Sequence, residues 1–258
     1  MATQKEKADL FKSLHVKGSP VILFNIWDPW SARTVEQAGA KALATGSWSV
    51  AAANGFTDGE ALPLELAILN AQKIVESVSL PVSLDFEGGY ATELTELKEN
   101  IQMVIGAGAI GINFEDQVVG GEGLYSIEEQ SARIAAIRET ADEESIPLFI
   151  NARTDVFLKT YPAKDTEEQL EETVRRGDAY ASAGASGFFV PGLRDVNLIK
   201  SLCERSRLPV NIMMLPDAAP TKTLAQQGVA RISYGPMPYR QMTAALHDAA
   251  QKAFAELE

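Results

Sequence analysis

The chain has 258 residues, enough for one barrel-sized domain or for two smaller ones. Apolar residues make up 46% and charged residues 22% of it, the proportions of an ordinary globular protein. The net charge of −12 argues against binding to nucleic acid or to an anionic membrane surface, because both require a basic face.

The chain has a single cysteine, Cys203, and therefore cannot form an internal disulfide. This favours a reducing compartment, and we expect a cytoplasmic location. Residues 1–12 are polar and charged and lack the apolar run of a signal peptide. No apolar stretch approaches the roughly 18 residues of a membrane helix, so we expect no membrane partner.

Short apolar runs alternate with segments of helical periodicity along the chain. A helix is predicted over residues 3–14, before the first of these runs. Eight runs predict strands, at residues 21–26, 41–45, 82–86, 109–114, 148–150, 187–190, 210–214 and 230–234. A long helix over about residues 238–256 closes the chain. The strand runs are mostly apolar on both faces, as is typical of buried parallel strands.

Helix starts agree with this division, because Ser126 with Glu129 and Thr166 with Gln169 fit capping boxes. Eight strands alternating with helices predict an α/β fold, a (β/α)8 TIM barrel that takes residues 1–258 as a single domain. No Gly-x-Gly-x-x-Gly motif opens the first helix, which weakens the dinucleotide-binding alternative. The last helix can pack on its own barrel or extend to another subunit.

The second strand ends in the run Thr45-Gly46-Ser47-Trp48. Small residues with hydroxyls and free backbone N–H groups suit a substrate carboxylate or an oxyanion, and a plain turn is the alternative. Asp58 follows in a turn-rich loop above the same end of the barrel. It can act as an acid or base, support a metal ligand, or simply belong to a turn.

Polar residues end the third, fourth and fifth strands. Strand side chains alternate between two faces, and active sites of such barrels lie at the C-terminal strand ends. The residues that share the face toward the barrel mouth are, strand by strand, Asp85 and Glu87, Asn113 and Glu115, and Asn151, Arg153 and Asp155.

Asp85, Glu87 and Glu115 are therefore predicted to converge on one small volume. Crowded carboxylates stay ionised only if a cation compensates them, and oxygen ligands without His or Cys favour Mg²⁺, with Mn²⁺ as the alternative. Since Mg²⁺ takes one or two direct carboxylates, we expect Asp85 to bind it directly and the two glutamates to bind mainly through water. Ion pairs of these acids with Lys or Arg are the competing interpretation.

Arg153 is expected to face the same site. Its guanidinium can hold a substrate carboxylate bidentately or pair with Glu115 or Asp155, and both can hold together. We interpret Asp58, Arg153 and Glu115 as catalytic. The predicted substrate-binding residues are Thr45, Gly46, Ser47, Trp48, Asn113, Asn151 and Arg153.

The remaining candidates are weaker. The glycine-rich loop at residues 117–125 is either a mobile lid or a flexible connection. His15 and His247 lie in the first and last helices and Cys203 lies inside a helix, so a Ser-His-Asp or Cys-His mechanism has no support. The run Arg231–Gly235 gives a faint indication of a phosphate grip.

At these motifs the chain resembles the isocitrate lyase/phosphoenolpyruvate mutase superfamily, over roughly residues 20–245. The resemblance lies in Asp85-Phe-Glu87-Gly88-Gly89, Gly111-Ile-Asn113-Phe-Glu115-Asp116 and Asn151-Ala-Arg153-Thr-Asp155, with Phe24-Asn-Ile-Trp-Asp28 and Ala44-Thr45-Gly46-Ser47 in support. It implies Mg²⁺, a metal-stabilised enolate, and a small 2-oxo acid, acylpyruvate-like acid or phosphonate as substrate. It also implies a homo-oligomer, dimer or tetramer, that swaps the last helix between subunits.

The same resemblance assigns roles to individual residues. It implies that Asp85 is the direct metal ligand, that Glu87 and Glu115 form the outer shell, and that Asp58 is an acid near the site. It further implies that Asn211, on the seventh strand, joins the substrate contacts.

The sequence departs from the motifs of these enzymes at two places, so the reaction of a particular lyase or mutase cannot be assigned to it. The loop at residues 117–125 has no Cys, His or Lys, whereas the lyases carry a Lys-Lys-Cys-Gly-His-type motif there and the phosphonate mutases a Lys-Thr-Asn-Ser-like stretch. The sixth strand ends in Val190-Pro191-Gly192, where the lyases tend to present a Glu. Glu122 or Tyr125 is a candidate replacement for the missing loop acid.

The first hypothesis is therefore a Mg²⁺-dependent lyase that cleaves a C–C bond in a small oxaloacetate- or acylpyruvate-like 2-oxo carboxylate. The second is a phosphoenolpyruvate or phosphonate mutase, or a P–C bond hydrolase. The third is a barrel that binds a metabolite without turnover.

Overall fold

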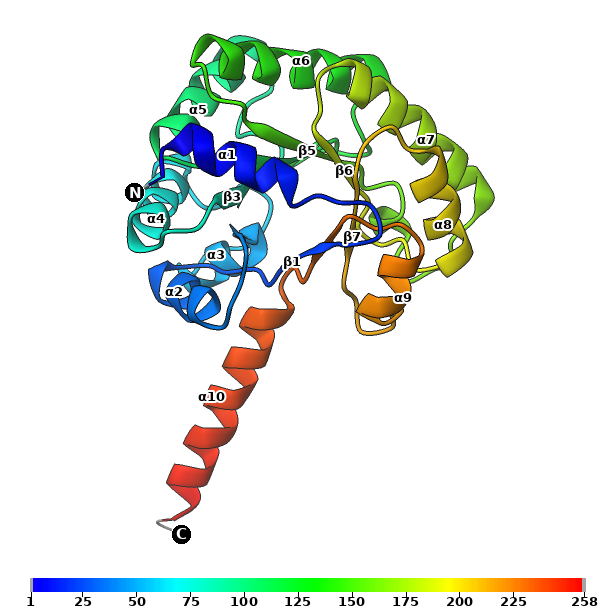
Figure 1. The fold of residues 1–258 in the computed structure, drawn as a ribbon. Coiled ribbons are helices and arrows are strands. Elements are labelled where there is room, and N and C mark those ends of the chain that lie inside the picture. The colour runs from blue at the N-terminus through cyan, green and yellow to red at the C-terminus, as the bar shows by residue number, and fades with distance from the viewer. Residues whose placement is uncertain (1, 257–258) are drawn as a thin grey trace.

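The computed structural model describes residues 2–256, and its strands form one parallel sheet that curls into a nearly closed barrel (Figure 1). The strands are β1 (Val21–Leu23), β2 (Leu43–Ala44), β3 (Val82–Asp85), β4 (Gly111–Glu115), β5 (Phe149–Arg153), β6 (Gly187–Phe189), β7 (Val210–Met213) and β8 (Arg231–Ser233). Around the barrel their order is β1-β8-β7-β6-β5-β4-β3-β2. An isolated parallel bridge between Ile26 and Thr45 joins the two end strands. The predicted (β/α)8 barrel is confirmed.

Most of the helices follow the strands and cover the outside of the sheet, whereas α1 precedes β1 and α10 extends away from the barrel (Figure 1). They are α1 (Gln4–Ser13), α2 (Pro29–Gln37), α3 (Ser47–Ala53), α4 (Leu64–Ser77), α5 (Leu94–Gly106), α6 (Ile127–Glu143), α7 (Glu167–Ser182), α8 (Val196–Arg205), α9 (Thr221–Gln226) and α10 (Met237–Ala255), with a short 3₁₀ turn, η1 (Leu158–Thr160). The two predicted capping boxes are present, at the starts of α6 and α7.

The main core lies between the sheet and the outer helices, where apolar side chains of α5, α6, α7 and α8 pack on β3 to β8. These helices bury one face each, which is the amphipathic pattern that the sequence shows. Burial of both faces of the strands leaves the C-terminal strand ends as the place where polar side chains reach solvent.

The opposite end of the barrel is closed by α1. Phe11 is fully buried there and meets the Phe149 ring edge-on, with ring centroids 5.3 Å apart. His15 stacks on Phe149, with ring centroids 4.2 Å apart, and also contacts the Phe11 ring at 4.7 Å. Burial, together with the nearby charge of Arg231, lowers the pKa of His15 to about 3, so the imidazole is neutral. His15, just after the end of α1, is thus a packing residue of the barrel floor.

The last helix, α10, projects away from its own barrel (Figure 1). Pro238 is its buried residue, whereas Leu246 and Phe254 are 66% and 71% exposed. The exchange of this helix between subunits stays a prediction. None of the helices in residues 2–256 combines the length and the apolarity needed to cross a membrane.

The packing of α1 predicts a large loss of stability on replacing Phe11. Phe11→Ala should lower the free energy of unfolding by about 3–5 kcal/mol, because it opens a cavity under the barrel. Leu10→Ala is the matched control, since Leu10 is 47% exposed on the same helix, and it should change stability by no more than about 0.5 kcal/mol. Urea unfolding measures both, and equal effects would refute a sealing role for α1.

Candidate active site

Strand register brings the predicted polar residues into two layers. Asp85 lies opposite Asn113, and Asn113 lies opposite Asn151. One pleat nearer the mouth, Glu115 lies opposite Arg153. The period-two interpretation therefore holds for the residues inside the strands, and it places carboxylates of β3 and β4 beside the guanidinium of β5. It does not extend to Glu87, which lies beyond the end of β3.

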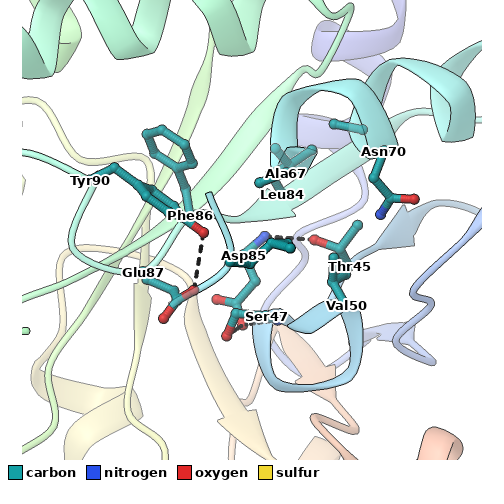
Figure 2. A pocket seen from close by; sticks show the side chains of 12 residues that line it. Thr45, Ser47, Val50, Ala67, Asn70, Leu84, Asp85, Phe86, Glu87 and Tyr90 are labelled. Carbon is teal, nitrogen blue, oxygen red and sulfur yellow. Dashed lines mark hydrogen bonds between the residues drawn. The ribbon is translucent and has the colours of Figure 1, made fainter. Parts of the chain in front are cut away.

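Asp85 ends β3 and is held by neighbours on both carboxylate oxygens. Ser47 donates to Oδ2 from its backbone N–H and from its hydroxyl, both at 3.0 Å (Figure 2). Asn113 donates from Nδ2 to Oδ1 at 3.1 Å. The backbone N–H of Asp85 donates to the Thr45 hydroxyl at 2.9 Å. These bonds fix the carboxylate in one orientation and leave lone pairs of its oxygens for a further partner.

Glu87 lies in a tight turn after β3, where its φ of 49° is in the left-handed region that few residues other than glycine adopt. Its Oε2 accepts hydrogen bonds from the backbone N–H groups of Gly59 and Glu60, at 3.0 and 2.8 Å. The Tyr90 hydroxyl donates to Oε1 at 3.4 Å (Figure 2). Glu87 therefore ties the loop after α3 to the end of β3.

Arg153 is held between two carboxylates. Its Nη1 lies 2.7 Å from Oε2 of Glu115, and its Nε and Nη2 donate to Asp155 at 2.6 and 2.8 Å. Burial opposes the charge of Arg153, but Asp155 and Glu115 outweigh it and raise its pKa. Both predicted ion-pair partners are thus present, and N–H groups of the five-donor guanidinium remain for a substrate.

A polar network lies below this layer, inside the barrel. Nδ2 of Asn151 donates to the side-chain oxygens of Asn113 and Asn211, at 2.9 and 3.0 Å. Arg231, from β8, is fully buried and donates to Oδ1 of Asn113 at 3.0 Å and to the Ser233 hydroxyl at 3.2 Å. Asn113 therefore accepts from Arg231 and donates to Asp85.

Arg231 is a buried cation without a carboxylate partner among residues 2–256. Burial lowers its pKa to about 9, although the nearby Asp85 opposes the shift, so it stays protonated at neutral pH. The Arg231 side chain lies beneath the site with no exposed surface and does not reach the cavity at the strand ends, whereas Ser233 and Gly235 of the same run line that cavity. A phosphate grip at residues 231–235 stays a prediction.

Asp58 reaches the same centre from the loop after α3. The Ser47 hydroxyl, which also contacts Asp85, lies within hydrogen-bond distance of Oδ1 of Asp58, at 3.2 Å. Desolvation and the neighbouring Asp85 carboxylate raise the pKa of Asp58. Desolvation, followed by the charges of Asp58 and Asp85, raises the pKa of Glu87 to about 8. Burial is the larger cause of these shifts and the charge of the neighbouring carboxylates the smaller one, and both disfavour the ionised form of the acids.

This donor set fits Mg²⁺. The acids at the barrel mouth, Asp58, Asp85, Glu87 and Glu115, offer oxygen ligands, which Mg²⁺ prefers, and excess negative charge that a dication would balance. No group of three or more His, Cys, Asp or Glu side chains in residues 2–256 is arranged to enclose a metal ion. A site with one or two direct carboxylates and several waters is the usual Mg²⁺ arrangement and agrees with this geometry.

A cavity of about 190 Å³ opens at the C-terminal strand ends beside these residues. Of the predicted site residues, it is lined by Gly46, Ser47, Trp48, Asp58, Asp85, Asn113 and Arg153. Thr45, Asn151 and Asn211 lie beneath it and are buried, where they support the residues that line it. Glu87 and Glu115 bound the acidic centre without lining this cavity, and their role as outer metal ligands stays a prediction.

Another small cavity, of about 20 Å³, lies behind Asp85 and Glu87 (Figure 2). Thr45, Asn70 and Tyr90 are among its polar lining residues. A space of this size accommodates about one water molecule with several polar partners. The Asp85 side chain therefore lies between this space and the larger cavity.

Sequence reasoning did not assign a role to Asn25, which lines the larger cavity. Its Oδ1 accepts from the backbone N–H groups of Tyr234 and Gly235, both at 2.9 Å, and its Nδ2 donates to the Thr45 carbonyl at 2.8 Å. Asn25 thus joins the ends of β1, β2 and β8. A buried asparagine at the end of an apolar strand was the signal in the sequence.

The glycine-rich loop lies beside this centre, against the turn after β3. Val119 packs on Gly88, and the Tyr125 ring stacks on the buried Arg133, whose carbon Cζ is 4.4 Å from the ring centroid. Neither Glu122 nor Tyr125 lines the larger cavity. Their role as replacement acids has no geometric support here, and lid motion stays a prediction.

The excluded nucleophiles are distant from the site or inert. Cys203 is buried on α8, and burial raises the pKa of its thiol to about 12. His247 is exposed on α10. The described part of the chain therefore places no cysteine or histidine at the cavity.

A family model described as phosphoenolpyruvate phosphomutase matches residues 11–254. A solved structure from Burkholderia cenocepacia J2315, described as a candidate phosphonomutase, is 48% identical in sequence and superposes with a TM-score of 0.94. The match covers 97% of this chain and 99% of that one.

Two other proteins are similar to the chain, one in sequence and one in fold. An oxaloacetate decarboxylase of Pseudomonas entomophila is 26% identical over 250 residues, which cover 92% of this chain and 81% of the relative. A phosphonopyruvate hydrolase, solved with oxalate and Mg²⁺, has a TM-score of 0.84 at 20% identity. The match covers 97% of this chain and 87% of the hydrolase, and at that identity it shows the shared fold alone.

Hydrogen bonds connect Arg231 to Asn113 and Asn113 to Asp85. We therefore predict that Arg231→Met lowers ligand affinity without lowering thermal stability. Binding of oxalate with Mg²⁺ should weaken about tenfold, because Asn113 loses the donor that orients it. Thermal stability should be unchanged or higher, because a buried cation without a carboxylate is removed. Calorimetric titration and thermal unfolding measure the two effects.

Arg207→Met, on the exposed surface, is the matched control and should change neither property. Unchanged oxalate affinity in Arg231→Met would refute the link between Arg231 and Asp85.

Proposed function

The chain belongs to the phosphoenolpyruvate phosphomutase family, within the isocitrate lyase/phosphoenolpyruvate mutase superfamily, and on that premise we propose that it is a Mg²⁺-dependent lyase. The substrate is a small 2-oxo carboxylate, oxaloacetate- or acylpyruvate-like, and the reaction breaks one of its C–C bonds. The observation that carries this proposal is the convergence of Asp58, Asp85 and Arg153 on one cavity at the C-terminal strand ends.

Asp85 would hold Mg²⁺ directly, with Glu87 and Glu115 acting through water. The bound ion would supply positive charge to the substrate oxygen that becomes anionic as the bond breaks. Ser47 and Asn113 keep the Asp85 carboxylate in its orientation, so that the ligand does not need to reorganise when substrate arrives.

Arg153 binds and orients the substrate carboxylate. Its contacts with Glu115 and Asp155 fix the guanidinium plane, and its remaining N–H groups are available to the substrate. Rigid positioning of this kind contributes to rate because the reacting atoms are held in alignment.

Asp58 is placed to move a proton. Its raised pKa brings the carboxyl closer to neutral pH, where a group can both accept and return a proton. In hydrolysis of an acylpyruvate, Asp58 accepts the proton of the water that attacks the acyl carbonyl; the C–C bond breaks, its electron pair passes to the pyruvate fragment, which takes up a proton, and a carboxylic acid leaves. In decarboxylation of oxaloacetate, the electron pair also passes to the pyruvate fragment while CO2 leaves, and Asp58 can return the proton. In a cleavage that gives oxalate, water adds to the 2-oxo carbon, and the electron pair and the proton go to the other fragment.

A phosphonate substrate is the second candidate, with mutase or P–C hydrolase chemistry. It is supported by the family model and by the description of the 48% identical Burkholderia structure. The missing polar residues of the loop at residues 117–125 count against the mutase. Release of inorganic phosphate from phosphonopyruvate, with none of the 2-oxo acids cleaved, would favour this candidate.

The test of the proposed function is Mg²⁺-dependent release of pyruvate or oxalate from oxaloacetate and a panel of acylpyruvates. Asp85→Asn should lower kcat/KM by roughly 10²-fold or more, because it removes the charge that holds the ion. Asp178→Asn, exposed on α7, is the matched control and should leave turnover unchanged. Binding of oxalate without turnover of any compound would contradict the lyase proposal and favour a binding protein.

We also propose a homo-oligomer, dimer or tetramer, in which α10 packs on another copy. Support comes from the exposed Leu246 and Phe254 on a helix that leaves its own barrel. A cytoplasmic location rests on the single cysteine and stays a prediction.

This assembly predicts that Leu246→Glu dissociates the oligomer, since it places a charge in an apolar contact. Light scattering coupled to size-exclusion chromatography gives the mass. Gln251→Glu on the same helix is the charge control. A wild-type protein that elutes as a monomer would refute the assembly.

A further inference from the structure

The cavity beside Asp85 has two chemically different sides. Its polar side is built by β2 to β4 and the loop after α3, and contains Ser47, Asp58 and Asp85. The other side carries four apolar side chains, which we call the apolar wall: Leu158, Phe189, Pro191 and Met213. A ligand in this cavity therefore meets charged groups at one end and hydrocarbon at the other.

The apolar wall is continuous because its members come from neighbouring strands. Leu158 follows β5, Phe189 ends β6 with Pro191 two residues later, and Met213 ends β7. These three strands are adjacent in the barrel, and β6 and β7 stand across it from β2 and β3. The wall therefore faces the acidic side from the far side of the cavity.

Close packing of two loops holds the wall in place. Gly192, with a φ of 91°, lets the loop after β6 approach the backbone of Phe157 and Leu158, where a Cβ would lie 2.6 Å from the Leu158 nitrogen. Any larger residue at this position would displace Leu158. Phe189 is 4% exposed and packs near the Arg153 guanidinium, whose carbon Cζ is 5.9 Å from the ring centroid.

Among residues 2–256, the far side of the cavity carries no cation besides Arg153, which ends β5 and lies beside Phe189 of the apolar wall. Of the residues in the described range 2–256 that line the cavity, Arg153 is the one cation, and two carboxylates already contact it. Arg231 lies buried beneath the cavity floor. Arg240, on α10, stacks on Trp48, with its carbon Cζ 4.7 Å from the ring centroid, and does not line the cavity. Arg194, near the rim, pairs with Asp165 and Asp217.

We infer that the substrate carries one anionic 2-oxo carboxylate head and, at its other end, an uncharged apolar group that packs on Leu158, Phe189, Pro191 and Met213. This inference rests on the proposed function and narrows its substrate class. A second carboxylate or a phosphonate at that end would be buried against hydrocarbon without a counter-ion, which is costly. Acyl- or alkyl-substituted 2-oxo acids therefore fit better than oxaloacetate or phosphonopyruvate.

The test uses oxamates, unreactive compounds with the 2-oxo carboxylate head and a variable tail on nitrogen. The series is oxamate, N-methyloxamate, N-isobutyloxamate and N-carboxymethyloxamate. The last two have tails of the same shape, one apolar and one anionic. Calorimetric titration in the presence of Mg²⁺, with oxalate as the reference for the head group, gives each Kd.

Each methylene of an apolar tail that leaves water should tighten binding about fourfold. We therefore expect N-isobutyloxamate to bind at least about tenfold more tightly than oxamate, and N-carboxymethyloxamate to bind more weakly than N-isobutyloxamate by a larger factor. The expected order of affinity follows tail apolarity and not tail size.

Two variants place a cation on the wall, Met213→Arg and Leu158→Arg. Each should shift the preference toward N-carboxymethyloxamate by at least about tenfold. Met213→Gln is the matched control, because it removes apolar character without adding charge and should weaken N-isobutyloxamate alone. Thermal unfolding of each variant confirms that it is folded, and the two positions serve as independent tests.

The outcomes separate this inference from the proposed function. If oxalate binds with Mg²⁺ but affinity is independent of the tail, or is highest for the anionic tail, the apolar substrate class is refuted and the lyase proposal stands. If neither oxalate nor any oxamate binds, the head-group site is refuted and both proposals fall.

Discussion

The structure depends on a balance of charge at the mouth of the barrel. Asp58, Asp85, Glu87, Glu115 and Asp155 crowd one region, while Arg153 and Arg231 are the guanidiniums close to them. Burial and like charges raise the pKa values of Asp58, Glu87 and Glu115, while hydrogen bonds and Arg153 oppose the shift. The Mg²⁺ that we propose for the site would supply further positive charge, and it would link the packing of the barrel to the proposed chemistry.

The two arginines act at different depths. Arg153 lies in the layer nearest the mouth, where it neutralises Glu115 and Asp155 and still faces the cavity. Arg231 lies below, and acts on Asp85 through Asn113. A buried cation without a carboxylate lowers stability, and its position under the acid that we propose as the metal ligand is consistent with a protein that loses some stability at a functional site.

The site also separates reaction chemistry from substrate recognition. Strands β2 to β4 supply the acids, and the ends of β5 to β7 supply the apolar wall. A barrel allows this division because each strand end contributes separately to the same rim. The residues at the ends of β5 to β7 can therefore change while those at the ends of β2 to β4 stay the same. Pro191 of the apolar wall belongs to the run Val190-Pro191-Gly192, the strand end at which the sequence departs from the lyases that it resembles.

The sequence by itself determined the eight-stranded barrel and the direction of its polar side chains, because alternation in short strands and capping signals are local properties. It correctly aimed Asp85, Asn113 and Arg153 toward one face. Only the tertiary structure decided how deep in the barrel each polar side chain lies. The register of the strands places Asn151 and Asn211 beneath the cavity, where they are buried. The tertiary structure also decided which loops and distant strands meet there, because Asn25 and Arg231 reach the site through closure of the sheet, a contact that no local pattern encodes.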